Sequence, residues 1–266
     1  KVPITRECFQ QLPRLKFICV TATGYNIVDI AAAREYGVTV SNVPAYSTMS
    51  VAQMVFAHLL NITNRVNDYA SQNREGMWNR QEDFCYRNLP LHELDGKTIC
   101  VIGMGSIGTA VSRIAQAFGM QVVAVSSKAS ESLPVGIVKM QINEALACAD
   151  VVTIHCPQTP QNVKMFNAEL LGRMKKNSIL INTARGGLID EEAVADALRS
   201  GRLGAYAADV VSVEPPSDAN PLITAPNAYL TPHVAWATDE ARTRLLTVCY
   251  DNIKNFIKNH PINIVT

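Results

Sequence analysis

The chain has 266 residues, 48% of them hydrophobic, so it is long enough to form about two domains with apolar cores. Its 24 Lys and Arg residues nearly balance its 23 Asp and Glu residues, which argues against nucleic acid or a membrane surface as partner and favours a small molecule. The seven cysteines have no CxxC spacing, which predicts reduced thiols, a cytoplasmic location and no structural metal. No apolar run reaches about 18 residues and the first segment is polar, so we expect neither a membrane span nor a signal peptide.

The first part of the chain predicts a small α/β unit. It has an apolar strand at Lys16 to Val20, a helix over Ile27 to Tyr36 and a second strand at Val38 to Val40. A long helix follows and begins at a cap residue, Ser47 or Ser50. One face of this helix is apolar, which predicts that it is buried, and comprises Val51, Val55, Leu59, Ile62 and Val66.

Strands and helices alternate regularly after Lys97. The expected strands are short apolar runs at Ile99 to Ile102, Val122 to Val125, Val151 to Ile154, Ser178 to Asn182, Ala205 to Ala208 and Tyr229 to Thr231. The expected helices have apolar residues at helical spacing and cover Ile107 to Phe118, Glu144 to Ala149, Ala168 to Met174, Glu191 to Ser200 and Asp239 to Lys258. This alternation predicts an α/β fold with a Rossmann-like, doubly wound parallel sheet.

The segment GMGSIG joins the first of these strands to its helix. Gly103, Gly105 and Gly108 have GxGxxG spacing, which lets the backbone approach a pyrophosphate, and the helix N-terminus offers it free amides and a partial positive charge. The motif alone is weak evidence, because a tight glycine turn in another α/β protein has the same letters. Its place between a strand and a helix, with a second strand after them, indicates a dinucleotide site.

The residues after the second strand bear on the choice of cofactor. A NAD site usually has Asp or Glu about 20 residues beyond the glycines, where it binds the ribose hydroxyls. Here Ser126, Ser127 and Lys128 stand in that place, and their hydroxyls and ammonium suit a 2′-phosphate better. The alternative is a solvated turn, since Glu131 is close enough in sequence to offset the lysine charge. The residues slightly favour NADPH over NADH, or the use of both.

Polar residues follow four of the expected strands. His155, Arg185, Asp209 and His233 each come just after a different strand. Ligands of an open parallel sheet bind at the carboxyl ends of its strands. Each residue alone has an ordinary structural interpretation, but together they predict a site.

Several segments closely resemble the signatures of the D-isomer-specific 2-hydroxyacid dehydrogenases. They are the glycine loop, IHCPQTPQN, NTARGGLIDEEAV, ADVVSVEPP and LTPHVAWATDEA, and they stand in the family's order between about Pro13 and Val265. The segments ATGYNIVD, MWNRQEDF and TPHVAWATDEA are most similar to the glycerate dehydrogenase or hydroxypyruvate reductase branch.

The resemblance implies an NAD(P)-dependent enzyme that reduces a small 2-keto acid, hydroxypyruvate or glyoxylate, reversibly to D-glycerate or glycolate. It implies that Arg185 binds the substrate carboxylate and carbonyl, for which a planar guanidinium is suited. His233 would be the acid that protonates the carbonyl oxygen, and the base in the reverse direction. Glu214 would be its partner, because a carboxylate beside an imidazole favours the imidazolium and orients the ring.

Further site residues are carried over from the family. Asp209 matches the acceptor for the nicotinamide carboxamide, and Thr23 and Gly24 match the turn that binds the substrate carboxylate. Trp236 is a candidate wall of the substrate pocket, with simple packing as an equal alternative. The loops expected to line the cofactor contain Ser106, Ile107, Cys156, Pro157, Asn162, Thr183 and Ala184.

The resemblance also implies a division into domains. We expect a dinucleotide-binding domain at residues 47–236, which includes the long interdomain helix. Residues 1–46 would form part of a smaller, flavodoxin-like α/β substrate domain, to which the C-terminal helix in residues 237–266 returns. These two pieces are short for a typical α/β domain of about 100 residues, so the substrate domain is expected to be incomplete at its N-terminus.

Two further expectations concern assembly and function. A homodimer is expected from the long helix and from the arm between Gly76 and Pro90, which carries the aromatic residues Trp78, Phe84 and Tyr86. The alternative to an enzyme is an NAD(H)-sensing regulatory protein, because transcriptional corepressors share this fold. The absence of a basic tail or low-complexity arm favours the enzyme.

Overall fold

A computed structural model describes residues 2–266, which form two compact units. The terminal unit comprises the residues up to Ser50 together with Trp236–Thr266, and the sheet unit comprises Val51–Ala235. Both boundaries lie within four residues of the expected ones. The roles of the two units in binding substrate and dinucleotide stay predictions.

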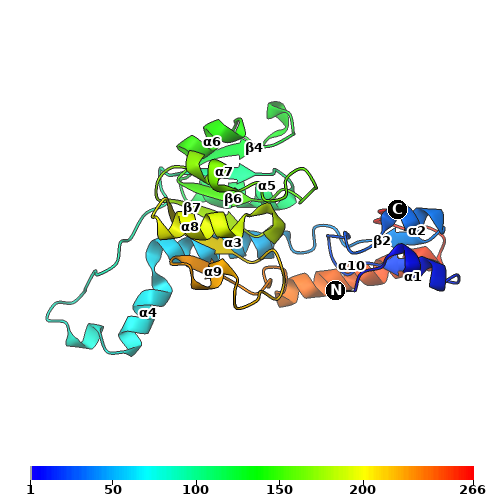
Figure 1. Ribbon diagram of the computed structural model, residues 1–266, viewed down its shortest axis with the longest axis horizontal. Coiled ribbons are helices and arrows are strands. Elements are labelled where there is room, and N and C mark those ends of the chain that lie inside the picture. The colour runs from blue at the N-terminus through cyan, green and yellow to red at the C-terminus, as the bar shows by residue number, and fades with distance from the viewer. Residues whose placement is uncertain (1) are drawn as a thin grey trace. The chain divides into compact units, whose positions relative to one another are not determined.

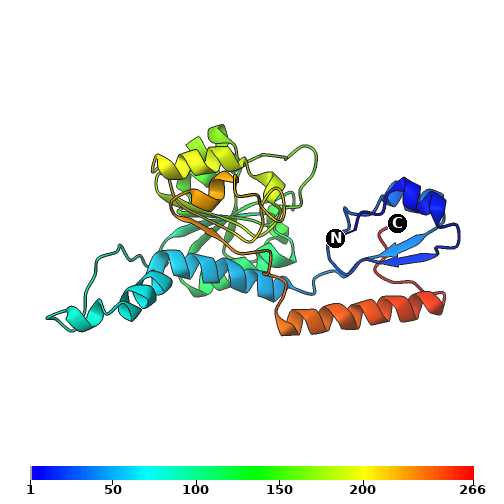
Figure 2. The ribbon, with the colours of Figure 1, turned by 60° about the horizontal axis from the view of Figure 1, so that its bottom comes forward.

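The terminal unit is built on two parallel strands, β1 (Phe17–Cys19) and β2 (Thr39–Ser41). Figure 2 shows this pair with α10 on one side and α1 and α2 on the other. Phe17 stacks on Phe256 of α10, with ring centroids 4.4 Å apart. The helices are α1 (Arg6–Gln11), α2 (Ile30–Glu35) and α10 (Asp239–Ile257).

The sheet unit contains seven parallel strands in the order β5-β4-β3-β6-β7-β8-β9. This order starts at β3 and proceeds to each side, which confirms the predicted doubly wound, Rossmann-like sheet. The strands are β3 (Thr98–Ile102), β4 (Gln121–Val125), β5 (Ile137–Lys139), β6 (Val151–Ile154), β7 (Ser178–Asn182), β8 (Leu203–Ala208) and β9 (Ala228–Leu230).

Helices cover both faces of this sheet (Figure 1). In β3, Ile99 and Val101 point into a core shared with α3 and α5, whereas Cys100 and Ile102 point into a core shared with α6, α7 and α8. Apolar side chains on both faces of β3 are therefore buried, so its residues Ile99–Ile102 form a continuous apolar run, as is typical of a parallel strand covered on both sides. The helices are α3 (Thr48–Asn64), α4 (Val66–Arg74), α5 (Ser106–Ala117), α6 (Ile142–Cys148), α7 (Ala168–Arg173), α8 (Glu191–Arg199) and α9 (Pro221–Thr224).

Three short 3₁₀ helices complete the sheet unit. They are η1 (Trp78–Arg80), η2 (Ser130–Ser132) and η3 (Gly186–Leu188). The sequence prediction did not include them, nor β5, α1, α4 and α9. It also extended the long helix to Val66, whereas α3 ends at Asn64 and Arg65 has a left-handed backbone with φ of 52°. None of the helices among residues 2–266 is long and apolar enough to cross a bilayer.

Candidate functional site

The four polar residues predicted at strand ends lie where the sequence placed them. β6 ends at Ile154, β7 at Asn182, β8 at Ala208 and β9 at Leu230. These four strands are parallel neighbours, so His155, Arg185, Asp209 and His233 all follow the same edge of the sheet. The glycine loop after β3 lies at this edge too.

The glycine loop passes close to other backbone. A Cβ on Gly103, whose φ is 97°, would stand 2.7 Å from Cys156 N, and a Cβ on Gly108 would collide with Gly103 O. Gly105 is the N-cap of α5 and has no side chain to satisfy the amides of the first turn. Those amides face open space at Gly105 and fit the pyrophosphate of a dinucleotide.

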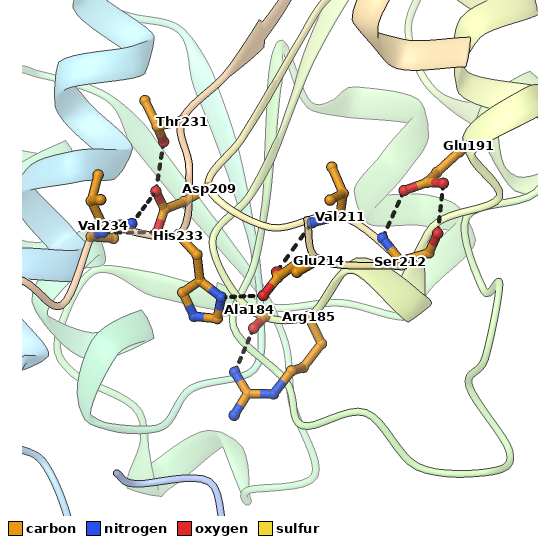
Figure 3. A network of polar contacts seen from close by, with 11 residues as sticks. Ala184, Arg185, Glu191, Asp209, Val211, Ser212, Glu214, Thr231, His233 and Val234 are labelled. Carbon is orange, nitrogen blue, oxygen red and sulfur yellow. Dashed lines mark hydrogen bonds and ion pairs between the residues drawn. The ribbon is translucent and has the colours of Figure 1, made fainter. Parts of the chain in front are cut away.

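His233 and Glu214 form the central pair of the site (Figure 3). His233 Nδ1 lies 2.6 Å from Glu214 Oε2, and Val211 N donates to Glu214 Oε1 at 3.4 Å. Both side chains are partly buried. His233 has a left-handed backbone with φ of 55°, a conformation that costs free energy for a residue other than glycine and is common at functional sites.

Arg185 is presented by a turn that Asn182 holds together. The fully buried Asn182 side chain donates to Arg185 O at 2.9 Å and accepts from Ala184 N at 3.0 Å. Arg185 Nη1 donates to Ala184 O at 2.7 Å. Directly after it, a Cβ on Gly186 would collide with the Val211 carbonyl, so glycine lets the loops of Arg185 and Glu214 come together.

Asp209 is a buried carboxylate, 1% exposed, with three donors from the chain itself. Thr231 Oγ1 donates to Oδ1 at 2.6 Å, Val234 N donates to Oδ1 at 2.9 Å, and Ala235 N donates to Oδ2 at 2.7 Å. These contacts bracket His233 on both sides along the chain (Figure 3). A carboxylate has about four acceptor positions, so Asp209 retains capacity for a further donor.

Glu191 braces the loop that carries Glu214, and the sequence prediction did not include it. At the start of α8, its Oε1 accepts from Ser212 N at 2.7 Å and its Oε2 from Ser212 Oγ at 2.6 Å (Figure 3). Oε2 also accepts from Asn220 Nδ2 at 3.1 Å. The only sequence signal was an acidic residue in the first turn of a helix, which a favourable helix dipole explains equally well.

The turn after β4 is contacted by a lysine that the sequence prediction did not include, Lys139. Lys128 N donates to Ser126 Oγ at 3.1 Å, and Lys139 Nζ donates to Lys128 O at 2.6 Å. Lys139 ends β5, the strand that the sequence prediction omitted, so its place beside this turn was not foreseen. Ser127 belongs to the same turn.

The other cofactor-loop residues lie at or after the same strand edge. Burial raises the pKa of the Cys156 thiol, which disfavours the thiolate that a nucleophile needs. The Thr183 hydroxyl is buried without a partner from the chain, as expected of a group that bonds a ligand. Asn162 bonds its own loop, donating to Pro157 O and accepting from Thr159 N. Ser106 and Ile107 begin α5, and Ala184 precedes Arg185.

His155 is a second histidine at this edge of the sheet. Burial lowers its pKa to about 3, so the imidazole is neutral at pH 7, and its Nε2 lies 2.9 Å from Thr153 Oγ1. The residues of the terminal unit predicted to bind substrate are Thr23, whose hydroxyl donates to Val43 O, Gly24, and Trp236, which packs against an apolar cluster. Their roles stay predictions. Within residues 2–266 no three His, Cys, Asp or Glu residues are grouped to hold a metal ion.

The chain is similar to known proteins over its whole length. Residues 56–235 match the D-isomer specific 2-hydroxyacid dehydrogenase, NAD binding domain, family. The whole chain is 41% identical to a hydroxypyruvate reductase of Blautia hydrogenotrophica and 40% identical to a glycerate dehydrogenase of Methylorubrum extorquens, and covers 83% of each. A solved acyclic imino acid reductase in complex with NADPH and D-Arg is 31% identical, with a TM-score of 0.89 over the whole chain and 83% of that protein.

Proposed function

The chain belongs to the D-isomer-specific 2-hydroxyacid dehydrogenases, and on that premise we propose that it reduces hydroxypyruvate or glyoxylate with NAD(P)H, reversibly forming D-glycerate or glycolate. The observation that carries this proposal is the 2.6 Å contact between His233 and Glu214 at the sheet edge that also carries Arg185 and the glycine loop. An imidazole paired with a carboxylate is a competent proton donor for a carbonyl oxygen.

His233 is proposed to exchange the proton through Nε2, because Glu214 engages Nδ1. The carboxylate fixes the orientation of the ring and stabilises its positive charge before the proton leaves. In the oxidative direction the neutral ring takes the hydroxyl proton back. His155 is a poor substitute, since its lowered pKa keeps it neutral over the range in which an acid is needed.

Arg185 is proposed to bind the substrate carboxylate with paired N–H donors. A guanidinium donates two parallel bonds to a carboxylate, which fixes position and plane together. Its turn is held by Asn182, so little ordering remains when substrate binds.

The glycine loop and the first turn of α5 are proposed to hold the pyrophosphate, and Thr183 and Asp209 to contact the nicotinamide half. The nicotinamide ring, when bound, supplies the hydride that reduces the carbonyl carbon. Two observations support this assignment: the Thr183 hydroxyl has no partner from the chain, and Gly103 and Gly108 stand where an added Cβ would collide with backbone atoms.

The cofactor preference is proposed to be for NADPH, or for both cofactors. Lys128 lies in the turn of Ser126, and the Lys139 ammonium donates to the backbone carbonyl of Lys128, so two lysines belong to or contact this turn. Two cations and a hydroxyl favour a 2′-phosphate electrostatically.

A homodimer is also proposed, formed through the arm at residues 76–90. Trp78 is 52% exposed and Phe84 is 83% exposed, and large exposed aromatic side chains commonly mark contacts. Tyr86 differs from the expectation, because its ring packs edge-on against Tyr69 and its hydroxyl donates to Asn73.

The proposed activity is tested by steady-state oxidation of NADPH and NADH with a panel of 2-keto acids. Hydroxypyruvate and glyoxylate should give the highest kcat/KM, and larger or branched 2-keto acids should give lower values. A chain that binds either cofactor but turns over no acid in the panel would point to the sensing protein instead.

A further inference from the structure

His58 is a buried polar residue that the proposed chemistry does not use. It lies on α3 and is 6% exposed. Its Nε2 lies 3.2 Å from Thr231 Oγ1, on the segment that leads from β9 to His233. A buried imidazole that forms a hydrogen bond to the loop of the candidate acid is expected to have a role in addition to packing.

The direction of each hydrogen bond in this contact follows from proton counting. Thr231 has one hydroxyl proton, and its 2.6 Å contact to Asp209 Oδ1 is a charge-assisted bond that takes this proton. Thr231 Oγ1 therefore accepts from His58, whose Nε2 must carry a hydrogen. Burial lowers the pKa of His58, so the ring is neutral and this hydrogen defines its tautomer.

The chain of bonds ends on the turn that carries the candidate acid. Asp209 accepts from the Thr231 hydroxyl and from the amides of Val234 and Ala235, so residues on both sides of His233 are tied to one carboxylate (Figure 3). His233 itself is held with φ of 55°, which requires support from its surroundings.

We propose that His58 is a positioning residue, which donates through Nε2 to Thr231 and thereby fixes the Asp209 carboxylate and the turn that aims His233. This inference rests on the proposed function in taking His233 as the proton donor. His58 touches neither that ring nor a reacting atom. Without the hydrogen bond from His58, the Thr231 hydroxyl is free to rotate away from Asp209. The turn then keeps only the contacts of the Val234 and Ala235 amides with this carboxylate.

Kinetics of four variants test the proposal. His58→Leu removes the donor and should lower kcat for keto-acid reduction about ten- to hundredfold, because the His233 ring is no longer held in the orientation needed for proton transfer. KM should change less than about threefold, because the substrate contacts remain. His58→Gln retains an N–H near the Nε2 position and should restore kcat to within about threefold of the parent. Thr231→Val should lower kcat about as much as His58→Leu. The double variant should have a kcat close to that of either single variant, since both substitutions interrupt the same hydrogen-bond chain from His58 to Asp209.

The matched control is Thr63→Val. Thr63 is also buried on α3, but its hydroxyl donates only to Leu59 O within the helix, so kcat should stay near the parent value. Equal losses in the Leu, Gln and Thr63 variants would overturn the proposal, because they would show a general sensitivity of α3. Circular dichroism and thermal melting identify a variant that fails to fold, and the Gln and Thr231 variants then decide.

A second readout does not depend on activity. In the chain labelled with ¹⁵N-histidine, the ring signals of His58 should show the hydrogen on Nε2, and His58→Leu and Thr231→Val should shift the ring signals of His233. Thr63→Val should leave them in place. If the chain reduces no keto acid yet these shifts occur, the proposed function fails and the positioning network stands. An Nδ1–H tautomer, or unmoved His233 signals, would overturn the network itself.

Discussion

Arg185 is the residue whose chemistry is most specific to a carboxylate substrate. Its replacement by Lys retains the charge but loses the paired donors, and its replacement by Ala loses both. We expect both variants to lose most reductase activity, with kcat/KM reduced at least about ten- to hundredfold in the Lys variant, since a charge-assisted hydrogen bond contributes about 1.5 to 3 kcal/mol. Steady-state kinetics with hydroxypyruvate measure this. Near-normal turnover in the Lys variant would remove Arg185 from the role.

The lowered pKa of His155 makes the free energy of unfolding depend on pH. Its ordinary pKa of 6.5 is lowered to about 3 by burial, so below pH 6.5 the unfolded chain binds a proton that the folded chain does not. Stability is therefore lost as pH falls from 6.5 toward 3, with a limiting slope of about 1.4 kcal/mol per pH unit from this group. Urea unfolding at fixed protein concentration should show a steeper decline in the parent than in His155→Gln. Parallel declines would contradict the assignment.

At the scale of elements, the sheet was predictable because burial on both faces gives continuous apolar strands. β3, β4 and β6 are recognisable as such runs in the sequence, and Gly103 marks the end of β3 and the start of the loop that leads to α5. β5 was not predictable in this way. It has three residues at the edge of the sheet, begins directly after Gly136, and is only partly buried, so its pattern resembles a loop.

The site was predictable where its chemistry is local to a strand end or a family motif. Arg185, Glu214 and His233 stand in such motifs, and the structure places the last two in contact. Glu191 and His58 were missed because their partners, Ser212 and Thr231, are far away in sequence. A hydrogen bond between distant segments leaves no periodic signal in one sequence.

The turn after β4 and the end of β5 together predict the cofactor preference. Ser126→Asp should move the preference toward NADH, because the new carboxylate binds ribose hydroxyls and repels a 2′-phosphate. Lys139→Ala should weaken NADPH selectively, by about one to two decades in affinity for a lost charge-assisted contact. Fluorescence titration of both cofactors measures these changes.

The control for this prediction is Lys176→Ala, an exposed lysine at the opposite, amino end of β7. It should leave the ratio of the two affinities unchanged. A parent that binds NADH far more tightly than NADPH would show that Ser126, Lys128 and Lys139 form a solvated turn and no phosphate site.

At the scale of the whole molecule, the arm at residues 76–90 predicts the assembly. Sedimentation at micromolar concentration should show a homodimer for the parent, and Trp78→Ser combined with Phe84→Ser should shift it toward monomer by removing exposed aromatic surface. Tyr86→Ser is a poorer probe, since that side chain is bonded within its own chain. A parent that is monomeric throughout would contradict the prediction.

The most direct test of the account compares hydroxypyruvate reduction by the parent and by His233→Asn with saturating NADPH or NADH. The parent should turn over, and the variant should fall by about 10²- to 10⁴-fold in kcat, the range typical of a lost general acid, while still binding cofactor. A parent without turnover, or a variant within about threefold of the parent, would contradict the claim that His233, held by Glu214, is the proton donor of a 2-keto acid reductase.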